Sequence, residues 1–291
     1  MKKALAIINP ISGISSKGSI PELLADAFRD TDIQLFLTYT KEGGHAYDLA
    51  RTAVDHGYYM VIAVGGDGTV NEVAKALLYS SAILGIVPKG SGNGLARALN
   101  LSMNEGRAIE QLVKGRVRTI DCCKANEHPF FCTCGMGFDA EVSAKFAESP
   151  FRGPIAYVKT AIEKFISYTP GYYDVEFNDQ KLKKEAFLIA AANANQYGNN
   201  AYIAPNASME DGVMDLVIMK PFHDIRAAQM ALQLFTKQLD KSSNTEIYQT
   251  KKVTICREKD GVVHLDGDAV NMGKKIIIEV LPRSIKVVAP A

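Results

Sequence analysis

The sequence has little net charge, few cysteines and histidines, and no long apolar run, and each shortage limits what the 291-residue chain can be. A membrane-spanning helix needs about 20 consecutive apolar residues, and no stretch approaches that length. The apolar residues 4–8 follow a basic start but end at Asn9 and Pro10, too early for the core of a signal peptide. We therefore predict a cytoplasmic protein whose first apolar run is a buried strand.

The balance of charge argues against nucleic acid as a partner. The chain has 33 Lys and Arg residues against 32 Asp and Glu residues, a formal net charge of +1. No strong field of one sign therefore surrounds it. Apolar residues make up 47% of the sequence, which is typical of a globular protein, and the length suits one large domain or two ordinary ones.

The few cysteines and histidines disfavour the common metal sites. No pair of cysteines has the Cys-x-x-Cys spacing of a zinc knuckle. We expect reduced thiols on neighbouring core strands at the four clustered positions, Cys122, Cys123, Cys132 and Cys134. The five histidines are scattered, with no pair spaced to put two ligands on one helix face. A histidine-based metal site or catalytic triad is therefore not expected.

Strand and helix signals alternate through the first 120 residues. Apolar runs predict strands at residues 4–8, 33–37, 60–64 and 83–87. Helical spacing predicts helices at residues 20–28, 45–56, 70–78, 95–99 and 109–113, and Ser102 with Glu105 has the spacing of a capping box before the last of these. This alternation predicts a doubly wound, mostly parallel α/β domain over residues 1–121, with ligands at the carboxyl ends of its strands.

Short strand-like runs dominate the rest of the chain. They occur at residues 130–133, 172–177, 186–192, 214–219, 247–256, 262–265, 276–280 and 285–288. Helical spacing at residues 155–166 and 225–239 interrupts them, and residues 193–212 form a long loop of the kind that often carries function. We predict an antiparallel β-sandwich domain over residues 122–291. Asp139, between a strand and a helix, is interpreted as a helix N-cap.

The most informative motif follows the strand predicted at residues 60–64. Gly65, Gly66 and Gly68 surround Asp67 at a turn that leads into a helix. Glycines let a ligand approach the main chain, and the helix N-terminus favours an anion such as phosphate. A carboxylate in this turn repels phosphate unless a divalent cation bridges the two, so the motif predicts a metal–nucleotide complex. The plainer alternative is a tight turn of any doubly wound sheet.

A second glycine-rich loop, residues 88–94, lies between another strand and helix. It lacks the Gly-Lys-Ser/Thr ending of a Walker A loop, and a dinucleotide-binding motif would follow the first strand instead. Ser91 and Asn93 are candidates for binding phosphate or adenine. The loop after the first strand, residues 9–13, also contains glycine, so all three loops should share one edge of the sheet.

Two acidic clusters lie in the second half of the chain. One places Glu210, Asp211 and Asp215 around a glycine, and the other places Asp266 and Asp268 at the end of a predicted strand. Asp-Gly is common in turns, so each cluster can be a plain polar turn. The functional interpretation is a metal site in the first cluster and a general base in the second, because phosphoryl transfer to a hydroxyl needs both.

Together these motifs resemble those of the diacylglycerol kinase catalytic-domain family, which includes bacterial lipid kinases and sphingosine and ceramide kinases. The matching segments are Asn-Pro-x-x-Gly at residues 9–13, Gly-Gly-Asp-Gly-Thr-x-Asn-Glu-Val at 65–73, Pro-x-Gly-Ser-x-Asn at 88–93, Gly-Phe-Asp-Ala at 137–140, Asp-Gly at 211–212 and Leu-Asp-Gly-Asp at 265–268. They follow the family's order over nearly the whole chain.

The resemblance implies a two-domain kinase that uses ATP and Mg²⁺, with ATP between an α/β domain and a β-sandwich. It transfers the ATP contacts to Asn9, Pro10, Ile11, Ser12, Gly13, Thr40, Gly65, Gly66, Asp67, Gly68, Thr69, Val70, Asn71 and Ser91. It assigns Mg²⁺ to Asp211 and to main-chain oxygens of Ser208 and Val213.

The catalytic roles implied by the resemblance fall on three aspartates. Asp268 takes the position of the proton acceptor, where bacterial diacylglycerol kinases usually have glutamate. Because the aspartate is shorter, Asp266 beside it remains an alternative base. Asp67 is expected to help hold the metal and the phosphates, directly or through water.

Two other functions share part of this pattern. NAD kinases share Gly-Gly-Asp-Gly-Thr, but residues 71–73 and the loop at 88–93 match lipid kinases instead. A non-catalytic nucleotide-binding module would be expected to lack the acidic residues that this chain retains. The acceptor stays open among diacylglycerol, a sphingoid base, ceramide and phosphatidylglycerol, because lipid pockets are lined by generic apolar residues.

A lipid acceptor predicts peripheral contact with a membrane surface. Residues 147–166 and their neighbourhood mix aromatic and basic side chains, as interfacial segments do, namely Phe146, Phe151, Arg152, Tyr157, Lys159, Lys164 and Phe165. The same pattern also suits a helix packed on its own domain. A second copy of the chain, in a homodimer, is a further partner compatible with the sequence.

Overall fold

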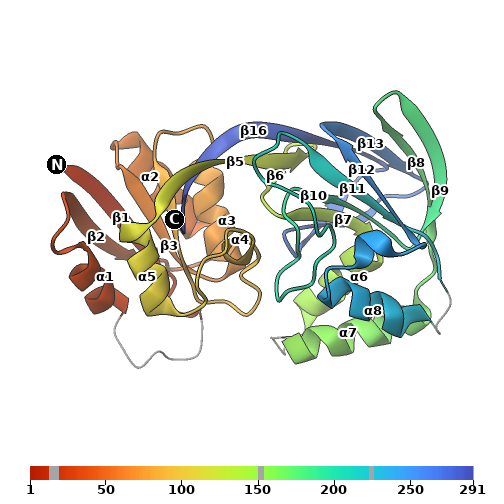
Figure 1. Ribbon diagram of the computed structural model, residues 1–291, viewed down its shortest axis with the longest axis horizontal. Coiled ribbons are helices and arrows are strands. Elements are labelled where there is room, and N and C mark those ends of the chain that lie inside the picture. The colour runs from red at the N-terminus through yellow and green to blue at the C-terminus, as the bar shows by residue number, and fades with distance from the viewer. Residues whose placement is uncertain (13–19, 150–153, 223–225, 291) are drawn as a thin grey trace. The chain divides into compact units, whose positions relative to one another are not determined.

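The computed structural model describes residues 1–12, 20–149, 154–222 and 226–290. The chain divides into two compact units (Figure 1). Unit 1 comprises Met1–Ile120 and Arg283–Ala291, and unit 2 comprises Asp121–Pro282. The last nine residues, which the sequence places with the second domain, therefore belong to unit 1.

Unit 1 is built on a parallel sheet, as predicted. Its strands run in the order β2 (Ile33–Tyr39), β1 (Lys2–Ile8), β3 (Met60–Gly65), β4 (Ile83–Pro88) and the end of β16 (Lys275–Ala289). Every residue of β3 and β4 is buried, because the central strands of such a sheet are covered on both faces. The carboxyl ends of β1, β2, β3 and β4 lie at one edge of the sheet.

The described residues of unit 1 form the helices α1 (Ile20–Phe28), α2 (His45–Asp55), α3 (Asp67–Ala76), α4 (Gly94–Ala98) and α5 (Glu105–Lys114). Buried Leu24, Phe28 and Ile109 from α1 and α5 share one core cluster with the strands. The capping box predicted from Ser102 is wrong. Asn104 is the N-cap of α5, and its side chain accepts a hydrogen bond from the Arg107 amide at 3.1 Å.

Unit 2 contains two antiparallel sheets, which confirms the predicted sandwich. One holds the start of β16 with β13 (Lys252–Arg257), β8 (Gly171–Phe177) and β9 (Gln180–Ala186), and β5 (Arg116–Ala125) with β6 (His128–Phe130) joins it. The other runs in the order β12 (Thr245–Thr250), β11 (Met214–Met219), β10 (Leu188–Ala192), β7 (Thr133–Gly137), β14 (Gly261–Leu265) and β15 (Asp268–Met272).

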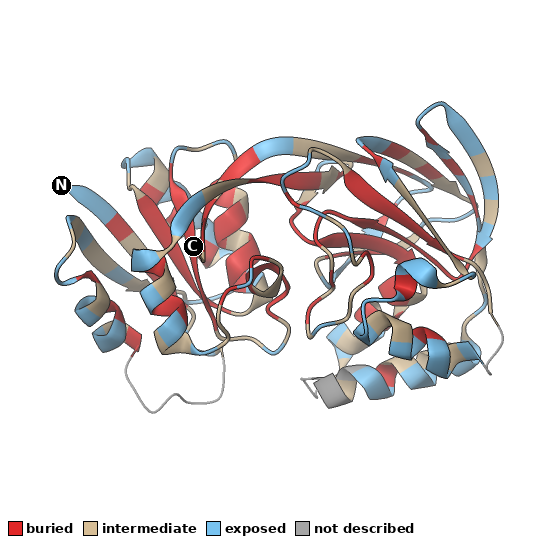
Figure 2. Cartoon of the chain, in the orientation of Figure 1, coloured by how far each residue is buried: buried red, intermediate tan, exposed pale blue. Residues whose placement is uncertain are grey.

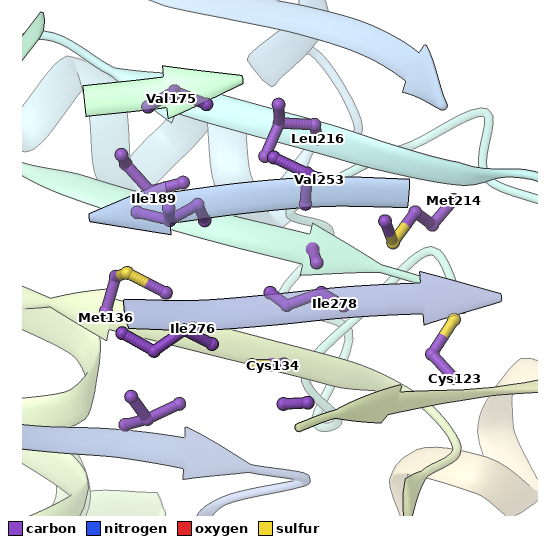
Figure 3. Packing of buried hydrophobic residues seen from close by; sticks show 14 of the residues in the cluster. Cys123, Cys134, Met136, Val175, Ile189, Met214, Leu216, Val253, Ile276 and Ile278 are labelled. Atoms are coloured by element: carbon purple, nitrogen blue, oxygen red, sulfur yellow. The ribbon is translucent and has the colours of Figure 1, made fainter. Parts of the chain in front are cut away.

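Side chains from both sheets form the core of unit 2. Val175, Val253 and Ile276 from the first sheet share one buried cluster with Ile189 and Leu216 from the second (Figure 3). None of the five cysteines, all of them in the described part of the chain, forms a disulfide, and the four clustered ones are buried, which confirms their predicted place in the core. Burial raises the pKa of the Cys123 and Cys134 thiols well above the ordinary value, so these groups stay protonated.

The described residues of unit 2 also form the helices α6 (Phe138–Glu148), α7 (Pro154–Ser167) and α8 (Ala227–Phe235) and a 3₁₀ helix (Leu239–Lys241). Phe138 and Phe165 from α6 and α7 pack with Phe187 in a second apolar cluster, on the outer side of the β7–β10–β11 sheet. Exposed and buried positions alternate along the helices (Figure 2). No helix over the described residues is long and apolar enough to cross a membrane.

Several strand boundaries differ from the predictions for reasons of local geometry. The run at residues 247–256 is two strands that enter different sheets, with Lys251 between β12 and β13. The runs at 276–280 and 285–288 are one long strand, β16. The apolar run at residues 130–133 covers the end of β6, the break after it and the start of β7.

Candidate active site

The first glycine loop of unit 1 is shaped by close contacts that only glycine allows. A Cβ atom on Gly65 would lie 2.6 Å from the Thr69 side chain, which is buried at the start of α3. The Thr69 hydroxyl in turn accepts a hydrogen bond from Asn9 Nδ2 at 3.0 Å. The loops after β1 and β3 are therefore joined side chain to side chain at the carboxyl edge of the sheet.

Asp67 binds the second glycine loop. Its two carboxylate oxygens accept hydrogen bonds from the backbone amides of Asn93 (2.9 Å) and Gly94 (2.7 Å), which open α4. A Cβ atom on Gly92 would lie 2.7 Å from Asp67 Oδ2, so this glycine leaves room for the carboxylate. A carboxylate at a helix N-terminus is electrostatically favourable. The residue singled out for metal and phosphate thus also ties two loops together.

The second loop also contacts the first along its backbone. A Cβ atom on Gly90 would lie 2.8 Å from the Gly66 Cα, and the Lys89 amide donates to the Gly65 carbonyl at 2.8 Å. Asn93, with a left-handed φ of 51°, uses its side-chain amide to bind both the amide and the carbonyl of Gly90. The two loops therefore form one backbone-on-backbone assembly with few side chains in between.

The remaining predicted nucleotide contacts of unit 1 cluster at the same edge of the sheet. Asn9, Pro10, Ile11 and Ser12 follow β1, and Thr40 follows β2, its amide bonded to the Ile8 carbonyl at 2.9 Å. Gly66 and Gly68 flank Asp67, Val70 and Asn71 are buried in the first turns of α3, and Ser91 is exposed. Gly13 lies outside the described residues.

Glu72 has a structural role that no local sequence pattern indicates. Its carboxylate accepts hydrogen bonds from the backbone amides of Gly44 (2.9 Å) and Ala46 (3.0 Å) at the start of α2. A helix leaves its first amides without intrahelical partners, and Glu72 supplies the acceptors from α3. This long-range cap fixes α2 against the helix that follows the first glycine loop.

Asp266 in unit 2 is held by the backbone. Its carboxylate accepts hydrogen bonds from the amides of Phe131 (2.8 Å), Cys132 (2.7 Å) and Thr133 (2.9 Å), in the break between β6 and β7. Burial raises the pKa of this carboxyl, and the three amides oppose that rise. Asp266 and Gly267, with φ of 52° and 94°, form the two-residue turn between β14 and β15. Asp266 therefore anchors the hairpin tip.

Asp268 is the exposed carboxylate of this hairpin. It pairs with Leu265 as the first residue of β15, an edge strand of the sheet. The sequence left Asp266 and Asp268 open as the proton acceptor. Because three amides already surround the Asp266 carboxylate, the geometry favours Asp268 for chemistry and Asp266 for holding the turn.

We predict that Asp266→Asn destabilises unit 2 by about 1–3 kcal/mol, because the new amide group turns a donor toward backbone donors. Urea unfolding followed by circular dichroism measures this, with Asp179→Asn in the exposed β8–β9 turn as the matched control. An unchanged urea midpoint with lost turnover would instead make Asp266 the base.

The acidic loop carrying Asp211 is tied to β5 by a residue that the sequence did not single out. Asp121 accepts a hydrogen bond from the Gly212 amide at 2.8 Å, and its own amide donates to the Met209 carbonyl at 2.7 Å. Asn193 opens the same loop and donates to the Asp121 carbonyl at 3.0 Å. No local pattern marks Asp121 or Asn193, because their partners are distant in sequence.

The three predicted Mg²⁺ ligands belong to this loop. Asp211 and Ser208 are exposed, Val213 is half-buried, and Asp211 Oδ1 accepts the Val213 amide at 3.2 Å. Among the described residues, no group of three or more His, Cys, Asp and Glu side chains is arranged to hold a metal. The predicted Mg²⁺ ligands do not require such a cluster of side chains, since they are one carboxylate and two main-chain oxygens. Hard oxygen donors of this kind fit Mg²⁺.

A second acidic side chain supports this fit. Asp215 is the second residue of β11, which follows the loop, and it is buried. Burial, opposed by a hydrogen bond from Gln249, raises the pKa of its carboxyl, and the negative charge of Asp211 raises it further. A cation bound at Asp211 would reduce this repulsion.

The interpretation of Asp139 as an N-cap is wrong. Gly137 is the N-cap of α6, and Asp139 lies in the first turn with its carboxylate buried. The carboxylate accepts hydrogen bonds from the Tyr197 hydroxyl at 2.9 Å and His264 Nε2 at 3.0 Å. The sequence missed this network, because it joins residues 58 and 125 positions away from Asp139.

The residues predicted to contact a membrane have different environments in the structure. Phe151 and Arg152 lie outside the described residues, as does the Tyr157 side chain. Phe165 packs in an apolar cluster of unit 2. Lys159 and Lys164 pair with Glu163 and Glu141.

The matching family models together cover nearly the whole chain. Residues 3–125 match the family model described as a diacylglycerol kinase catalytic domain. Residues 132–289 match the model described as a YegS C-terminal NAD kinase beta sandwich-like domain, which alone spans more than half of the chain.

Individual relatives agree with these matches. The chain is 28% identical to a "Diacylglycerol kinase" of Bacillus subtilis, over 97% of each chain. It is also 28% identical to a "Probable lipid kinase YegS-like" of Serratia proteamaculans, over 97% of this chain and 92% of that one. A crystal structure of a diacylglycerol kinase from Bacillus anthracis superposes with a TM-score of 0.77 at 22% identity, covering 99% and 97% of the two chains, which supports the fold.

Proposed function

Because the chain belongs to the family that combines a diacylglycerol kinase catalytic domain with a YegS-type β sandwich-like domain, we propose that it is an ATP- and Mg²⁺-dependent lipid kinase. The transferred group is the γ-phosphoryl of ATP, and the acceptor is a lipid hydroxyl. The product is a phosphorylated lipid, and ADP is released. Peripheral contact with a membrane surface follows from the acceptor.

The glycine-loop assembly of unit 1 is the observation that carries this proposal. Asp67 binds the loop at Asn93 and Gly94, while Gly66 and Gly90 approach each other without side chains. Such an assembly presents backbone amides and the N-terminus of α3 to an anion. ATP phosphates fit this surface, because glycine-rich turns before a helix bind phosphate in unrelated nucleotide-binding folds.

The acidic loop of unit 2 has the ligands for the metal. Asp211, with main-chain oxygens of Ser208 and Val213, would hold Mg²⁺, and Asp121 keeps this loop in place through Met209 and Gly212. The bound ion would supply positive charge against the phosphates.

We assign the proton acceptor to Asp268. A lipid hydroxyl attacking the γ-phosphorus must lose its proton, and a positioned carboxylate takes it. The oxygen–phosphorus bond to the acceptor forms as the bond to the ADP oxygen breaks. Asp266 keeps the hairpin tip fixed and so orients Asp268.

The direct test is a substrate panel. Purified protein is incubated with γ-labelled ATP, Mg²⁺ and mixed micelles of diacylglycerol, sphingosine, ceramide or phosphatidylglycerol, with NAD in a separate reaction. We expect label in one lipid product, lost on chelation with EDTA. Label on NAD would make the protein an NAD kinase. Saturable ATP binding without transfer to any acceptor would favour a non-catalytic nucleotide-binding module.

A further inference from the structure

The Asp139 carboxylate is the meeting point of three segments of unit 2. It receives the Ala140 amide of its own helix α6 at 2.8 Å, the Tyr197 hydroxyl at 2.9 Å and His264 Nε2 at 3.0 Å. Asp139 is 7% exposed and His264 is 2% exposed. A buried carboxylate is costly unless donors surround it, and here it has three.

Strand β7 packs closely against this network. A Cβ atom on Gly135 of β7 would collide with both Asp139 Oδ2 and His264 Nε2. Gly135 also pairs with His264 in the ladder between β7 and β14. The Tyr197 and His264 rings lie 5.5 Å apart at 65°, so the hydroxyl and the imidazole reach the same oxygen from different sides.

The protonation of His264 follows from its partners. A carboxylate oxygen only accepts, so Nε2 carries the proton that it donates to Asp139. Within the described residues, Nδ1 is buried and has no hydrogen-bond partner. The hydrogen bond between His264 and Asp139 therefore depends on Nε2 alone.

Both side-chain partners of Asp139 belong to segments next to or carrying a proposed functional residue. His264 is in β14, two residues before the turn formed by Asp266 and Gly267, which Asp268 follows. Tyr197 is in the loop at residues 193–213, which carries Asp211. Through one carboxylate, Asp139 therefore connects β14, which leads into the turn before Asp268, to the loop of the proposed metal ligand Asp211.

We propose that Asp139 is a positioning residue for phosphoryl transfer, acting through His264 on the β14–β15 hairpin and through Tyr197 on the 193–213 loop. This inference rests on the proposed lipid kinase activity. The His264 bond fixes the direction of β14 into the hairpin, and hence the place of Asp268. The Tyr197 bond holds the near end of the loop, while Asp121 holds its far end at Met209 and Gly212.

The simpler alternative is that the network only stabilises the core. A core role predicts one common effect of all variants, which is a lower melting temperature without a change in kinetic parameters. A positioning role predicts that loss of each of the two hydrogen bonds changes a different kinetic parameter. Loss of the histidine bond affects turnover, and loss of the tyrosine bond affects the need for metal.

The test compares Tyr197→Phe, His264→Leu and His264→Gln in the full chain. The glutamine Nε2 can replace the histidine Nε2 as a donor to Asp139. Tyr202→Phe is the matched control, because Tyr202 lies in the same loop, its hydroxyl contacts Asn200 at 3.4 Å, and phenylalanine keeps the ring that lies under the Lys237 ammonium. The kinetic readouts are kcat, the KM for ATP and the Mg²⁺ concentration for half-maximal activity.

We expect Tyr197→Phe to raise the required Mg²⁺ about tenfold, the loss typical of one hydrogen bond to a charged group. His264→Leu should lower kcat by at least about tenfold with an unchanged KM for ATP, and His264→Gln should restore most of it. Tyr202→Phe should behave like wild type. Folded variants with lower melting temperatures but unchanged kcat and Mg²⁺ requirement would overturn the proposal.

Hydrogen exchange separates failure of this inference from failure of the proposed activity. Without any substrate, Tyr197→Phe should increase amide exchange within residues 193–213, and His264→Leu should increase it within residues 261–272. If wild type phosphorylates no lipid but these local increases occur, the proposed function fails and the anchoring stands. A uniform increase over unit 2 in both variants would reject the anchoring.

Discussion

Asp268→Asn should lower the rate of lipid phosphorylation by about 100- to 10,000-fold, the usual contribution of a positioned general base. Asparagine keeps the shape of the side chain but cannot take the proton of the attacking hydroxyl. Because Asp268 is exposed at the start of an edge strand, the substitution should leave the urea midpoint close to that of wild type. The KM for ATP should change little, since the glycine loops belong to unit 1.

The length of the side chain at position 268 provides a second comparison in this experiment. The resemblance described from the sequence matches this position to a glutamate in bacterial diacylglycerol kinases, so Asp268→Glu should retain far more activity than Asp268→Asn. Asp179→Asn, in another exposed turn of unit 2, controls for the loss of one surface charge. Near-normal turnover in Asp268→Asn, together with inactive but folded Asp266→Asn, would transfer the role of base to Asp266.

The sequence predicted the α/β unit well because its strands are buried on both faces. Such strands appear as short continuous apolar runs, and those at residues 60–64 and 83–87 lie within one residue of the observed β3 and β4. Unit 2 was predicted less well at its strand ends. β15 contains Asp268, Asn271 and other exposed residues, so it has no apolar run to detect.

The positions of the functional segments were predictable, but their internal bonds were not. The glycine loops and acidic clusters are visible as residue patterns. What Asp67, Asp266 and Glu72 bind is decided by backbone amides 26 to 135 residues away, which carry no side-chain signature. These three acidic side chains therefore hold other segments in place by accepting hydrogen bonds from their backbone amides.

This pattern matters for how mutations of conspicuous carboxylates should be interpreted. Loss of activity after changing such a residue can come from lost chemistry or from a displaced loop. Stability, the KM for ATP and the metal requirement respond differently in the two cases, so they must be measured together. Asp67 is the residue for which both effects are expected at once.

Asp67→Asn should reduce turnover by about 100- to 1,000-fold, the loss seen when a charge-stabilising group is removed from a reaction centre. The asparagine side chain has one acceptor oxygen, so it can bind the amide of Asn93 or of Gly94 but not both. Its amino group would then face a backbone donor. We expect the urea midpoint of unit 1 to fall by an amount corresponding to about 1.5–3 kcal/mol.

The matched control is Asp48→Asn, an exposed aspartate in the first turn of α2 in the same unit. It should leave turnover and stability close to wild type, because no loop depends on it. A rise in the KM for ATP with full turnover at saturating ATP would show that Asp67 acts only by holding the second loop. Reduced turnover at saturating ATP and a higher Mg²⁺ requirement would show that its carboxylate also serves the metal and the phosphates. Wild-type turnover and stability would remove Asp67 from both roles, because one of its two amide bonds cannot be lost from this loop assembly without effect.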